Sequence, residues 1–577
     1  MAPPGYMDSD LDIARSAKPM KIEEVAEQLG LAPSDLIMHG PHIAKVSWES
    51  LSSGKSNKRG KLILVTSVNP TPFGEGKTVT TIGLNQGLNH RGHNACCVIR
   101  EPSLGPVFGI KGGAAGGGYS QVLPMEQINL HFTGDLHAIT AAHNLCSAIL
   151  DNHLHRGNDL DIDTNRIFWP RVIDMNDRTL REVSIGLGGP ATGVTRSERF
   201  DITAASEVMA ILSLSKSYED LRSRLGRIIV AESKSGLPVT AEQLGASGSM
   251  ALLLREAMLP NLVQTLEGNP AFVHCGPFAN IAHGNSSIIA DDLALSRSDY
   301  VVTEAGFGAE MGAEKALHIK ALASGVAPSC IVLNVTVRSM KLHGGGVAGG
   351  GGSRPTKEEI ETENVGAVRA GAASNLRRHV RNMAMTDIPV VVSINRFNTD
   401  TEAEIDAIRD EATKAGAVDI VLFEGFSKGG KGAAELADSV VSACSKHEQD
   451  GSPFSPIVDP GMPSNEAILR IGTNVYGANN VDLSDSAHSS LEKFKKWGFG
   501  NLPVCMAKTQ YSFSHDKKVL GAPVGFTLQV RETRLNAGAG FIVAVCGSMM
   551  TMPGLPSRPA AMDMDMDEEG RLTGVFG

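Results

Sequence analysis

The fold class follows from residues 62 to 99, which contain the run Leu62-Ile-Leu-Val65, the loop Thr71-Pro72-Phe73-Gly74-Glu75-Gly76-Lys77-Thr78 and the run Ala95 to Ile99. The first run is apolar and of strand length, and it leads into the proline and glycine of the loop. Lys77 to His90 has helical character, and Ala95 to Ile99 follows as a second strand candidate. Strand, loop, helix and strand in this order make the βαβ unit of a parallel sheet. The sequence therefore predicts an α/β fold with the loop at a strand end.

Apolar runs of the same kind recur along the 577 residues and extend the α/β prediction to the whole chain. They are Tyr300 to Thr303, Cys330 to Val335, Val390 to Ile394, Ile420 to Phe423 and Phe541 to Val545. A chain of this length exceeds one hydrophobic core, so we expect about two to four domains. Residues 1–60 are predicted to be a helical preamble. The low-complexity segment Met562 to Asp567 is predicted to be a solvated loop.

The loop Thr71 to Thr78 has the residue types of a phosphate-binding loop. Its glycines let backbone N–H groups converge on phosphate oxygens, and the N-terminus of the following helix adds partial positive charge. Lys77 can reach the terminal phosphates of ATP, and the Thr78 hydroxyl can ligate Mg²⁺. The usual pattern begins with glycine six residues before the lysine, where this chain has Thr71. A glycine turn at a helix start stays open as the alternative.

Arg100 and Glu101 follow the second strand candidate, where parallel sheets place ligand-binding groups. A guanidinium suits a carboxylate or a phosphoryl group, although Arg100 can equally be a surface residue that ends a strand. Glu101 is a candidate cation ligand or the partner of a nearby base. The segment Gly112 to Tyr119 is too rich in glycine for a packed element. Either its backbone approaches another group closely, or it is a hinge.

Phe307, Phe397 and Phe426 lie in loops near predicted strand ends, where a flat ligand ring can stack. A phenylalanine at such a place can equally belong to the core. His131, Asp135 and His137 lie close together in the sequence, but no further ligand pair has zinc-site spacing, so zinc is not favoured. No Gly-x-Ser-x-Gly motif or cysteine signature indicates a protein nucleophile, which argues against a hydrolase.

The composition indicates a protein without nucleic-acid or membrane partners. The formal net charge of −10 argues against nucleic-acid binding, and no stretch approaches the roughly 20 apolar residues of a membrane helix. The eight cysteines contain no CxxC pair and are expected to be reduced. The beginning of the chain resembles neither a secretory signal nor a transit peptide, so a cytoplasmic location is expected.

Several segments together resemble the formate–tetrahydrofolate ligase family, over a region from about residue 20 to the C-terminus. They include the loop Thr71 to Thr78, Arg100-Glu-Pro-Ser-Leu-Gly-Pro106, the run Gly109 to Tyr119 and Val335-Thr-Val-Arg-Ser-Met-Lys-Leu-His-Gly-Gly345. Gly276 to Gly284, Thr303 to Gly308 and Met550 to Pro556 add to the resemblance. The chain resembles the stand-alone form of the enzyme, because these motifs begin early.

The resemblance implies a reaction in which formate, ATP and tetrahydrofolate give 10-formyltetrahydrofolate, ADP and phosphate. Formate is first phosphorylated to formyl phosphate, with Lys77 and Mg²⁺ neutralising the charge on the transferring group. Arg100 would then hold the formyl phosphate while the folate amine attacks it. A monovalent cation, potassium or ammonium, is implied as an activator.

The resemblance also implies an aromatic pair that sandwiches a flat ligand ring. Phe397 resembles one member, and Phe426 stands where the family usually has tryptophan; Phe307 is a third candidate for the folate site. Glu310 stands where the family often has aspartate, which lengthens the reach of the carboxylate by one methylene.

The resemblance further implies a homotetramer of three-domain subunits. The expected nucleotide-binding domain of the phosphate-loop type comprises residues 1–121 and 310–377, an inserted α/β domain comprises 122–309, and a third α/β domain at 378–577 contributes to the folate site. The competing hypothesis is a nucleotide-switched partner protein that uses the same loop to drive assembly. It would hydrolyse ATP slowly and would not need Arg100 and the glycine run beside the loop.

Overall fold

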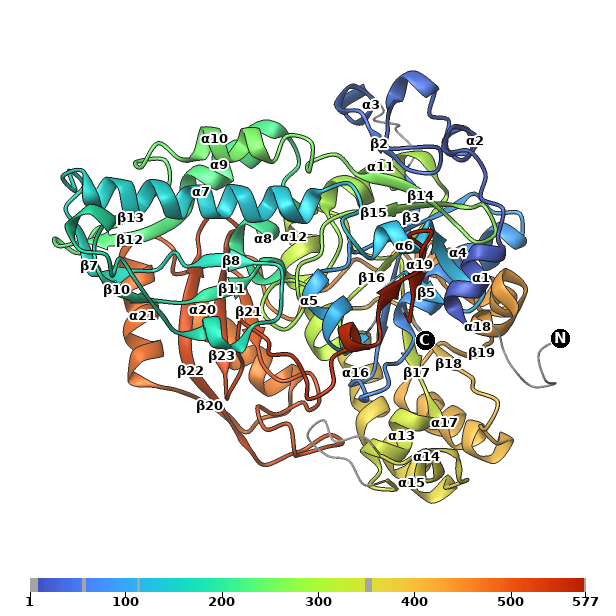
Figure 1. Cartoon of the computed structure of the whole chain (residues 1–577). Helices are drawn as coiled ribbons and strands as arrows, with labels where there is room; N and C mark the ends of the chain where they lie inside the picture. Colours follow the sequence, from blue (N-terminus) through green and yellow to red (C-terminus); the bar gives the residue numbers. More distant parts are fainter. Residues whose placement is uncertain (1–8, 54–58, 112–114, 348–354, 575–577) are drawn as a thin grey trace.

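A computed structural model describes residues 9–53, 59–111, 115–347 and 355–574 and is mixed α/β with a large, mainly parallel sheet (Figure 1). Within these residues the sheet has twelve strands. Its main path, in spatial order, is β1 (Leu36–Met38), β2 (Ala44–Val46), β14 (Asn261–Thr265), β15 (Pro270–Val273), β4 (Ala95–Ile99), β16 (Tyr300–Glu304), β3 (Lys61–Ser67), β17 (Cys330–Val335), β18 (Val390–Asn395) and β19 (Asp419–Phe423). The two strands off this path are β5 (Gly116–Gly117) and β6 (Ser120–Leu123).

The strands from β15 to β19 along this path run parallel to one another. Their side chains alternate between two covered faces, so that Ile63 and Val65 point to one core and Leu64 to the opposite one. A parallel sheet covered on both faces needs continuous apolar strands, which explains the runs read from the sequence.

Helices cover both faces of the parallel strands. One face packs against α4 (Lys77–His90) and α19 (Ala434–Asp450). The other face is covered by α11 (Ile288–Arg297), α13 (Val337–His343), α15 (Val365–Gly371), α16 (Arg377–Ala384) and α17 (Glu402–Ala415). The predicted βαβ unit is therefore confirmed as β3, α4 and β4, with the helix at the bounds expected from the sequence.

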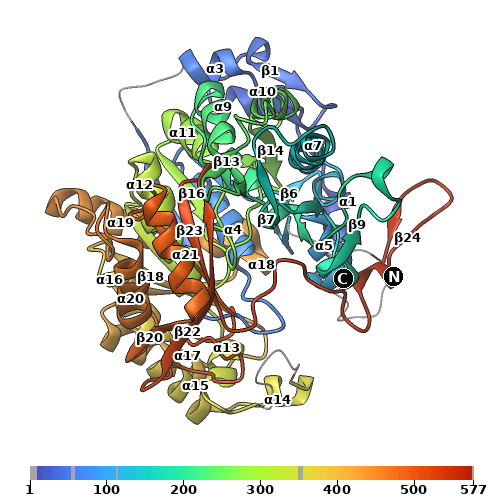
Figure 2. The ribbon, with the colours of Figure 1, turned by 90° about the vertical axis from the view of Figure 1, so that its left-hand side faces the viewer.

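A second part of the molecule combines residues that are far apart in the sequence. It contains α7 (Asp135–His155), α8 (Glu207–Leu214), α9 (Tyr218–Arg227) and a sheet of β20 (Asn480–Leu483), β22 (Thr527–Asn536), β23 (Phe541–Cys546) and β21 (Val504–Ala507). Leu150 of α7 and Val543 of β23 belong to one shared core. Figure 1 shows the orange sheet beside the teal helix α7, which is seen end-on in Figure 2.

The remaining strands form small sheets. They are β7 (Ile162–Ile167), β8 (Arg171–Ile173), β9 (Val183–Ile185), β10 (Arg196–Glu198), β11 (Phe200–Ile202), β12 (Ile229–Ser233) and β13 (Pro238–Thr240). The remaining α-helices are α1 (Asp10–Ser16), α2 (Ile22–Glu27), α3 (Trp48–Ser53), α5 (Leu104–Pro106), α6 (Met125–Ile128), α10 (Ser247–Leu253), α12 (Ala321–Ser324), α14 (Lys357–Glu361), α18 (Gly425–Lys428), α20 (Ser464–Arg470) and α21 (Asp485–Lys496).

Two local expectations from the sequence need correction. The first 60 residues are not only helical, because β1 and β2 lie between α2 and α3 and extend the edge of the large sheet. The segment Met562 to Asp567 is exposed as expected, but it is not only loop. It contains β24 (Asp565–Met566), which pairs with β25 (Leu572–Thr573). The Arg15 side chain of α1 donates a hydrogen bond to the Leu572 carbonyl oxygen and so connects this hairpin to α1.

The division into three domains stays a prediction, but the strand order bears on its boundaries. Strands β14 to β16 come from the expected inserted domain, and β18 and β19 come from the expected third domain. All of them belong to the same sheet as β3. The run Phe541 to Val545, an apolar run of the same kind, forms β23 of the second sheet, where it pairs in parallel with β21.

The structure bears on the expected state of the cysteines and on the search for membrane helices. All eight cysteines are buried and none forms a disulfide. In the part of the chain that the structure describes, no helix has both the length and the apolar character needed to cross a lipid bilayer.

Helix α4 approaches its neighbours closely because two of its residues are glycine. A Cβ atom at Gly83 would lie 2.6 Å from the Phe423 ring. A Cβ atom at Gly87 would lie 2.7 Å from the carbonyl oxygen of Ala433. These two glycines therefore fix how close α4, and with it the loop at its start, lies to the segment after β19.

We predict that Gly87→Ala lowers the free energy of unfolding by about 1 to 3 kcal/mol, because the methyl group meets a backbone that cannot move aside easily. The matched control is Gly366→Ala in α15, where the nearest atom to the new Cβ lies 3.8 Å away. This control should leave stability unchanged or raise it slightly, since alanine favours helix. Calorimetric Tm values compare the variants, and an unchanged Tm for Gly87→Ala would contradict the close approach.

Candidate active site

The candidate site residues follow the carboxyl ends of parallel strands that are neighbours in the sheet. Across the sheet they are Arg100 after β4, Phe307 after β16, Lys77 after β3, Phe397 after β18 and Phe426 after β19. Ligands of open α/β sheets bind at this edge. The topology therefore brings to one edge residues that are more than three hundred positions apart in the sequence.

Glu75 holds the loop Thr71 to Thr78 in shape through hydrogen bonds of its side chain and its backbone. Its buried carboxylate accepts the Thr71 N–H at 2.8 Å and the Thr336 hydroxyl at 2.6 Å. Its backbone oxygen accepts hydrogen bonds from the side-chain amides of Asn334 and Asn395. The loop is therefore tied to the ends of β17 and β18 before any ligand binds, which is the preorganisation that an anion site needs.

Thr71 is accommodated without strain at the position where the usual loop has glycine. Thr71 is absent from the residues with positive φ, so this position does not require glycine. Its hydroxyl accepts the Phe73 N–H at 3.2 Å. Glycine is required instead at Gly76, where φ is +73° and a Cβ would lie 2.5 Å from Nδ2 of Asn395. Because Gly76 has no side chain to cap α4, the first N–H groups of the helix are not capped by it.

Glu304, the last residue of β16, links the loop to Arg100. Its carboxylate accepts the Thr78 hydroxyl at 2.8 Å on one oxygen and Nε of Arg100 at 3.2 Å on the other. The side chain is 4% exposed. Sequence reasoning did not assign Glu304 to the site. The signal that could have found it is an acidic residue at the end of a strand in a segment shared with the family.

Burial alone would raise the pKa of the Glu304 carboxyl, but the charge of Arg100, the Thr78 hydroxyl and the charge of Lys77 together lower it below its ordinary 4.5. The ionised carboxylate therefore stabilises the folded site at neutral pH. This contribution is present above the ordinary carboxyl pKa and is lost only as the pH falls through the lowered value.

The Arg100 side chain is partly exposed, and hydrogen bonds hold the buried edge of its guanidinium. Nη1 donates to the Pro277 carbonyl oxygen at 3.4 Å, and the side chain is 23% exposed. A Cβ at Gly306 would lie 2.9 Å from Nη1, so the loop after β16 can pass this close only with glycine there. The guanidinium is thus oriented by Glu304 and by a backbone oxygen.

Lys77 and Phe307 are connected through Ser67 at the end of β3. Nζ of Lys77 donates to the Ser67 hydroxyl at 3.3 Å, and this hydroxyl donates to the Phe307 carbonyl oxygen at 3.1 Å. Phe307 has a φ of +58°, which is uncommon for a residue other than glycine. The three residues place the loop lysine beside the segment that follows β16.

Phe426 contacts the end of the glycine run. The Tyr119 N–H donates to the Phe426 carbonyl oxygen at 2.8 Å, and a Cβ at Gly118 would lie 2.9 Å from the ring. Asp10 of α1 accepts the Gly118 N–H at 2.7 Å from the other side. Close backbone approach therefore explains the glycines at the end of the run, while residues 112–114 lie outside the described residues. Phe426 itself is 38% exposed.

Glu101 lies apart from the Glu304 contact, in a buried acidic group. Burial raises the pKa of its carboxyl well above the ordinary value, the charge of Asp135 adds to this, and the charge of Lys45 opposes it. Lys45 and Asp135 form an ion pair at 2.8 Å. Oε2 of Glu101 has no hydrogen-bond partner among the described residues. A cation would remove the cost of burying this oxygen.

Glu310 supports the loop from the side of the second sheet. Its fully buried carboxylate accepts Nδ2 of Asn69 at 2.7 Å and Nζ of Lys508 at 3.3 Å. Asn69 comes two residues before Thr71. Glu310, which is one methylene longer than the aspartate common in the family, thus reaches both partners. Its carboxylate connects the loop to the segment after β21.

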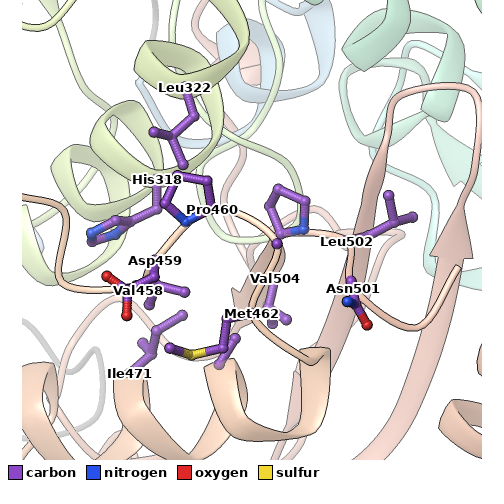
Figure 3. Close-up of a pocket in the computed structure, with 13 residues that line it drawn as sticks. His318, Leu322, Val458, Asp459, Pro460, Met462, Ile471, Asn501, Leu502 and Val504 are labelled. Atoms are coloured by element: carbon purple, nitrogen blue, oxygen red, sulfur yellow. The ribbon is translucent and has the colours of Figure 1, made fainter.

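A separate small cavity lies between α12 and the segment that leads into α20 (Figure 3). Its volume is about 20 Å³, and its lining includes His318, Val458 and Met462. The ring of His318 is fixed, since Nδ1 lies 3.0 Å from Glu314 and Nε2 accepts the Ile457 N–H. A space of this size holds one water molecule and no organic substrate.

The fold is that of an α/β enzyme. It has a mainly parallel sheet, a glycine-containing loop that leads into α4 and a buried Glu304 contact at the carboxyl edge, where ligands of such sheets bind. The chain belongs to the formate–tetrahydrofolate ligase family, whose family model matches residues 8–576. The resemblance seen in the sequence is therefore confirmed.

Relatives named formate–tetrahydrofolate ligase match over nearly their whole length. The protein of Paracoccus denitrificans is 52% identical over 570 residues, which cover 99% of this chain and 100% of that protein. The protein of Mesorhizobium japonicum is 52% identical, covering 98% and 99% respectively. The protein of Roseiflexus sp. is 52% identical, covering 99% and 100%.

We predict that Glu304→Gln lowers kcat/KM for ATP by about 100-fold, the size expected when reacting groups lose their alignment. The amide keeps the size of the side chain but removes the charge that orients Arg100. Glu448→Gln is the matched control, because Glu448 pairs with Lys61 at the opposite end of β3 and is exposed. Steady-state rates compare the two variants. Equal activity in both would show that Glu304 does not organise the site.

Proposed function

We propose that this protein ligates formate to tetrahydrofolate at the expense of ATP, giving 10-formyltetrahydrofolate, ADP and phosphate. The observation that carries the proposal is the Glu304 carboxylate, which joins the Thr78 hydroxyl of the loop to the Arg100 guanidinium. One site thus holds both a phosphate-binding loop and a group suited to formate or an acyl phosphate. Family membership supports the same reaction.

ATP would bind with its phosphates at residues Thr71 to Thr78. The backbone N–H groups of Gly74, Gly76 and the start of α4 would donate to phosphate oxygens, and Lys77 would reach the terminal phosphate. Thr78 would ligate Mg²⁺, with Glu304 beside it as a second oxygen donor. No cluster of three or more metal-binding side chains occurs among the described residues, which suits Mg²⁺ held by few protein oxygens and by phosphate.

In the first step a formate oxygen attacks the terminal phosphorus of ATP, so that formyl phosphate forms and ADP leaves. Mg²⁺ supplies neutralisation of the phosphate charge when bound. Lys77 stabilises the transferring phosphoryl group, and Arg100 holds the formate carboxylate in line with it. Both charges are positioned in advance by Ser67 and Glu304, so that catalysis relies on alignment and electrostatics.

In the second step the folate amine attacks the formyl carbon, phosphate leaves and the amine loses its proton. Arg100 would stabilise the departing phosphate. The flat ring of the folate would stack on Phe397 and Phe426, with Phe307 at the side of Lys77. Phe426 offers less area than the usual tryptophan, but its backbone is held through Tyr119.

The monovalent cation, potassium or ammonium, is proposed to bind at Glu101. The support is its buried oxygen without a hydrogen-bond donor beside the Lys45–Asp135 pair. We also retain the three-domain homotetramer and the cytoplasmic location as proposals. The nucleotide-binding domain is proposed to include β14 to β16 as well as β18 and β19, because these strands complete the sheet that carries the loop.

We predict that ADP formation requires both formate and tetrahydrofolate, with one folate formylated per ATP. Coupled assays of ADP and formylated folate measure the ratio. ADP released at the same rate without formate or without folate would contradict the ligase and would favour a nucleotide-switched partner protein.

In the same assay Lys77→Ala and Arg100→Ala should each lower turnover by about 100-fold or more. Lys234→Ala, which removes an exposed lysine paired with Asp161, is the control.

A further inference from the structure

The guanidinium group of Arg338 lies over one face of the Phe397 ring. The distance from its Cζ atom to the ring centroid is 3.8 Å. Arg338 belongs to α13, directly after β17, and Phe397 follows β18. The Phe397 N–H is held by Asp400 at 2.8 Å. Asp400 therefore holds the backbone of Phe397, and Arg338 contacts its ring.

Among the residues that the structure describes, Arg338 has no carboxylate within ion-pair distance. Arg369, Arg377 and Arg396 each form an ion pair with an aspartate or glutamate. Within the described part of the chain no ion pair of Arg338 occurs, and its buried Nε–H has no hydrogen-bond partner. The Phe397 ring is the contact that the structure shows for the guanidinium, and the Arg338 charge also acts on the Asp400 carboxyl, where it opposes the rise in pKa that burial causes. An arginine that served only to stabilise the fold would be expected to pair with a carboxylate.

Along the edge of the sheet, the strand end before Phe397 lies between those that precede Arg338 and Phe426. Arg338 follows β17, Phe397 follows β18 and Phe426 follows β19, and these strands are neighbours in this order. The guanidinium covers one face of the Phe397 ring, so that a ligand ring can stack only on the other face.

We propose that Arg338 is a positioning residue that supports Phe397 from behind, so that its other face receives the flat ring of a substrate. The inference rests on the proposed function. A cation on one face of an aromatic ring draws electron density toward itself, which favours stacking of an electron-rich ring on the other face. Amino-substituted, nitrogen-rich rings have this chemistry. The pterin of tetrahydrofolate and the adenine of ATP both qualify, and separate binding experiments distinguish them.

The test replaces Arg338 by methionine, which keeps the length of the side chain and removes the planar charge. Isothermal titration calorimetry on the full protein measures the Kd of tetrahydrofolate and of ATP in separate experiments. We expect Arg338→Met to weaken binding of the stacked ligand by about 3- to 30-fold, the range that a cation–π contact supports. Arg338→Lys should recover part of this loss. The KM for formate, which has no ring, should not change.

Arg396→Met is the matched control, because it removes an arginine next to Phe397 whose side chain pairs with Glu402 at the surface. A second comparison uses Phe397→Leu, alone and combined with Arg338→Met. If Arg338 acts through the ring, it adds no further loss of affinity once the ring is gone. Equal additional loss in the Phe397→Leu background would overturn the proposal.

Other outcomes are equally decisive. Unchanged affinity for both ligands in Arg338→Met overturns the inference, as does a loss confined to the KM for formate. If Arg338→Met does not fold, Arg338→Lys and Arg338→Gln carry the same comparison, and unchanged affinity in both overturns it. Because the binding measurements do not depend on turnover, they separate this inference from the proposed function, which fails if the unaltered protein does not formylate tetrahydrofolate.

Discussion

The site depends on one buried carboxylate, Glu304, which lies between the loop hydroxyl of Thr78 and the guanidinium of Arg100. It can do so because β16 lies between β4 and β3 in the sheet, so that the three strand ends are neighbours. An unpaired arginine and an unpaired glutamate would each be costly at this depth, whereas together they hold the site in shape.

Much of the fold could be predicted from the sequence because its strongest signals are local. The run Leu62 to Val65, the loop after it and the helix from Lys77 to His90 appear in the structure as expected, since apolar periodicity and glycine placement determine them. The same periodicity reports burial but not the partner strand, so it could not show that Phe541 to Val545 belongs to the second sheet. The strands β1 and β2 were missed because they are only three residues long.

The contacts of the site were harder to predict because they join distant segments. Lys77 and Arg100 could be chosen from their place after strand candidates, but Glu304 becomes meaningful only when the strand order brings it beside Thr78. The same applies to Asn69 and Glu310, and to the Arg338 guanidinium over Phe397. Thr71 illustrates the opposite case. It departs from the usual motif, yet its backbone needs no glycine, and its N–H and hydroxyl stabilise the loop.

The most direct test of this account is a crystal structure of the protein with Mg²⁺ and a non-hydrolysable ATP analogue. We predict that the phosphate chain lies against the N–H groups at the start of α4, with the terminal phosphate between Lys77 and Arg100. The Thr78 hydroxyl should then turn from Glu304 to the metal. A nucleotide bound elsewhere, with the Thr78–Glu304–Arg100 contacts unchanged and no phosphate at the loop, would contradict the account.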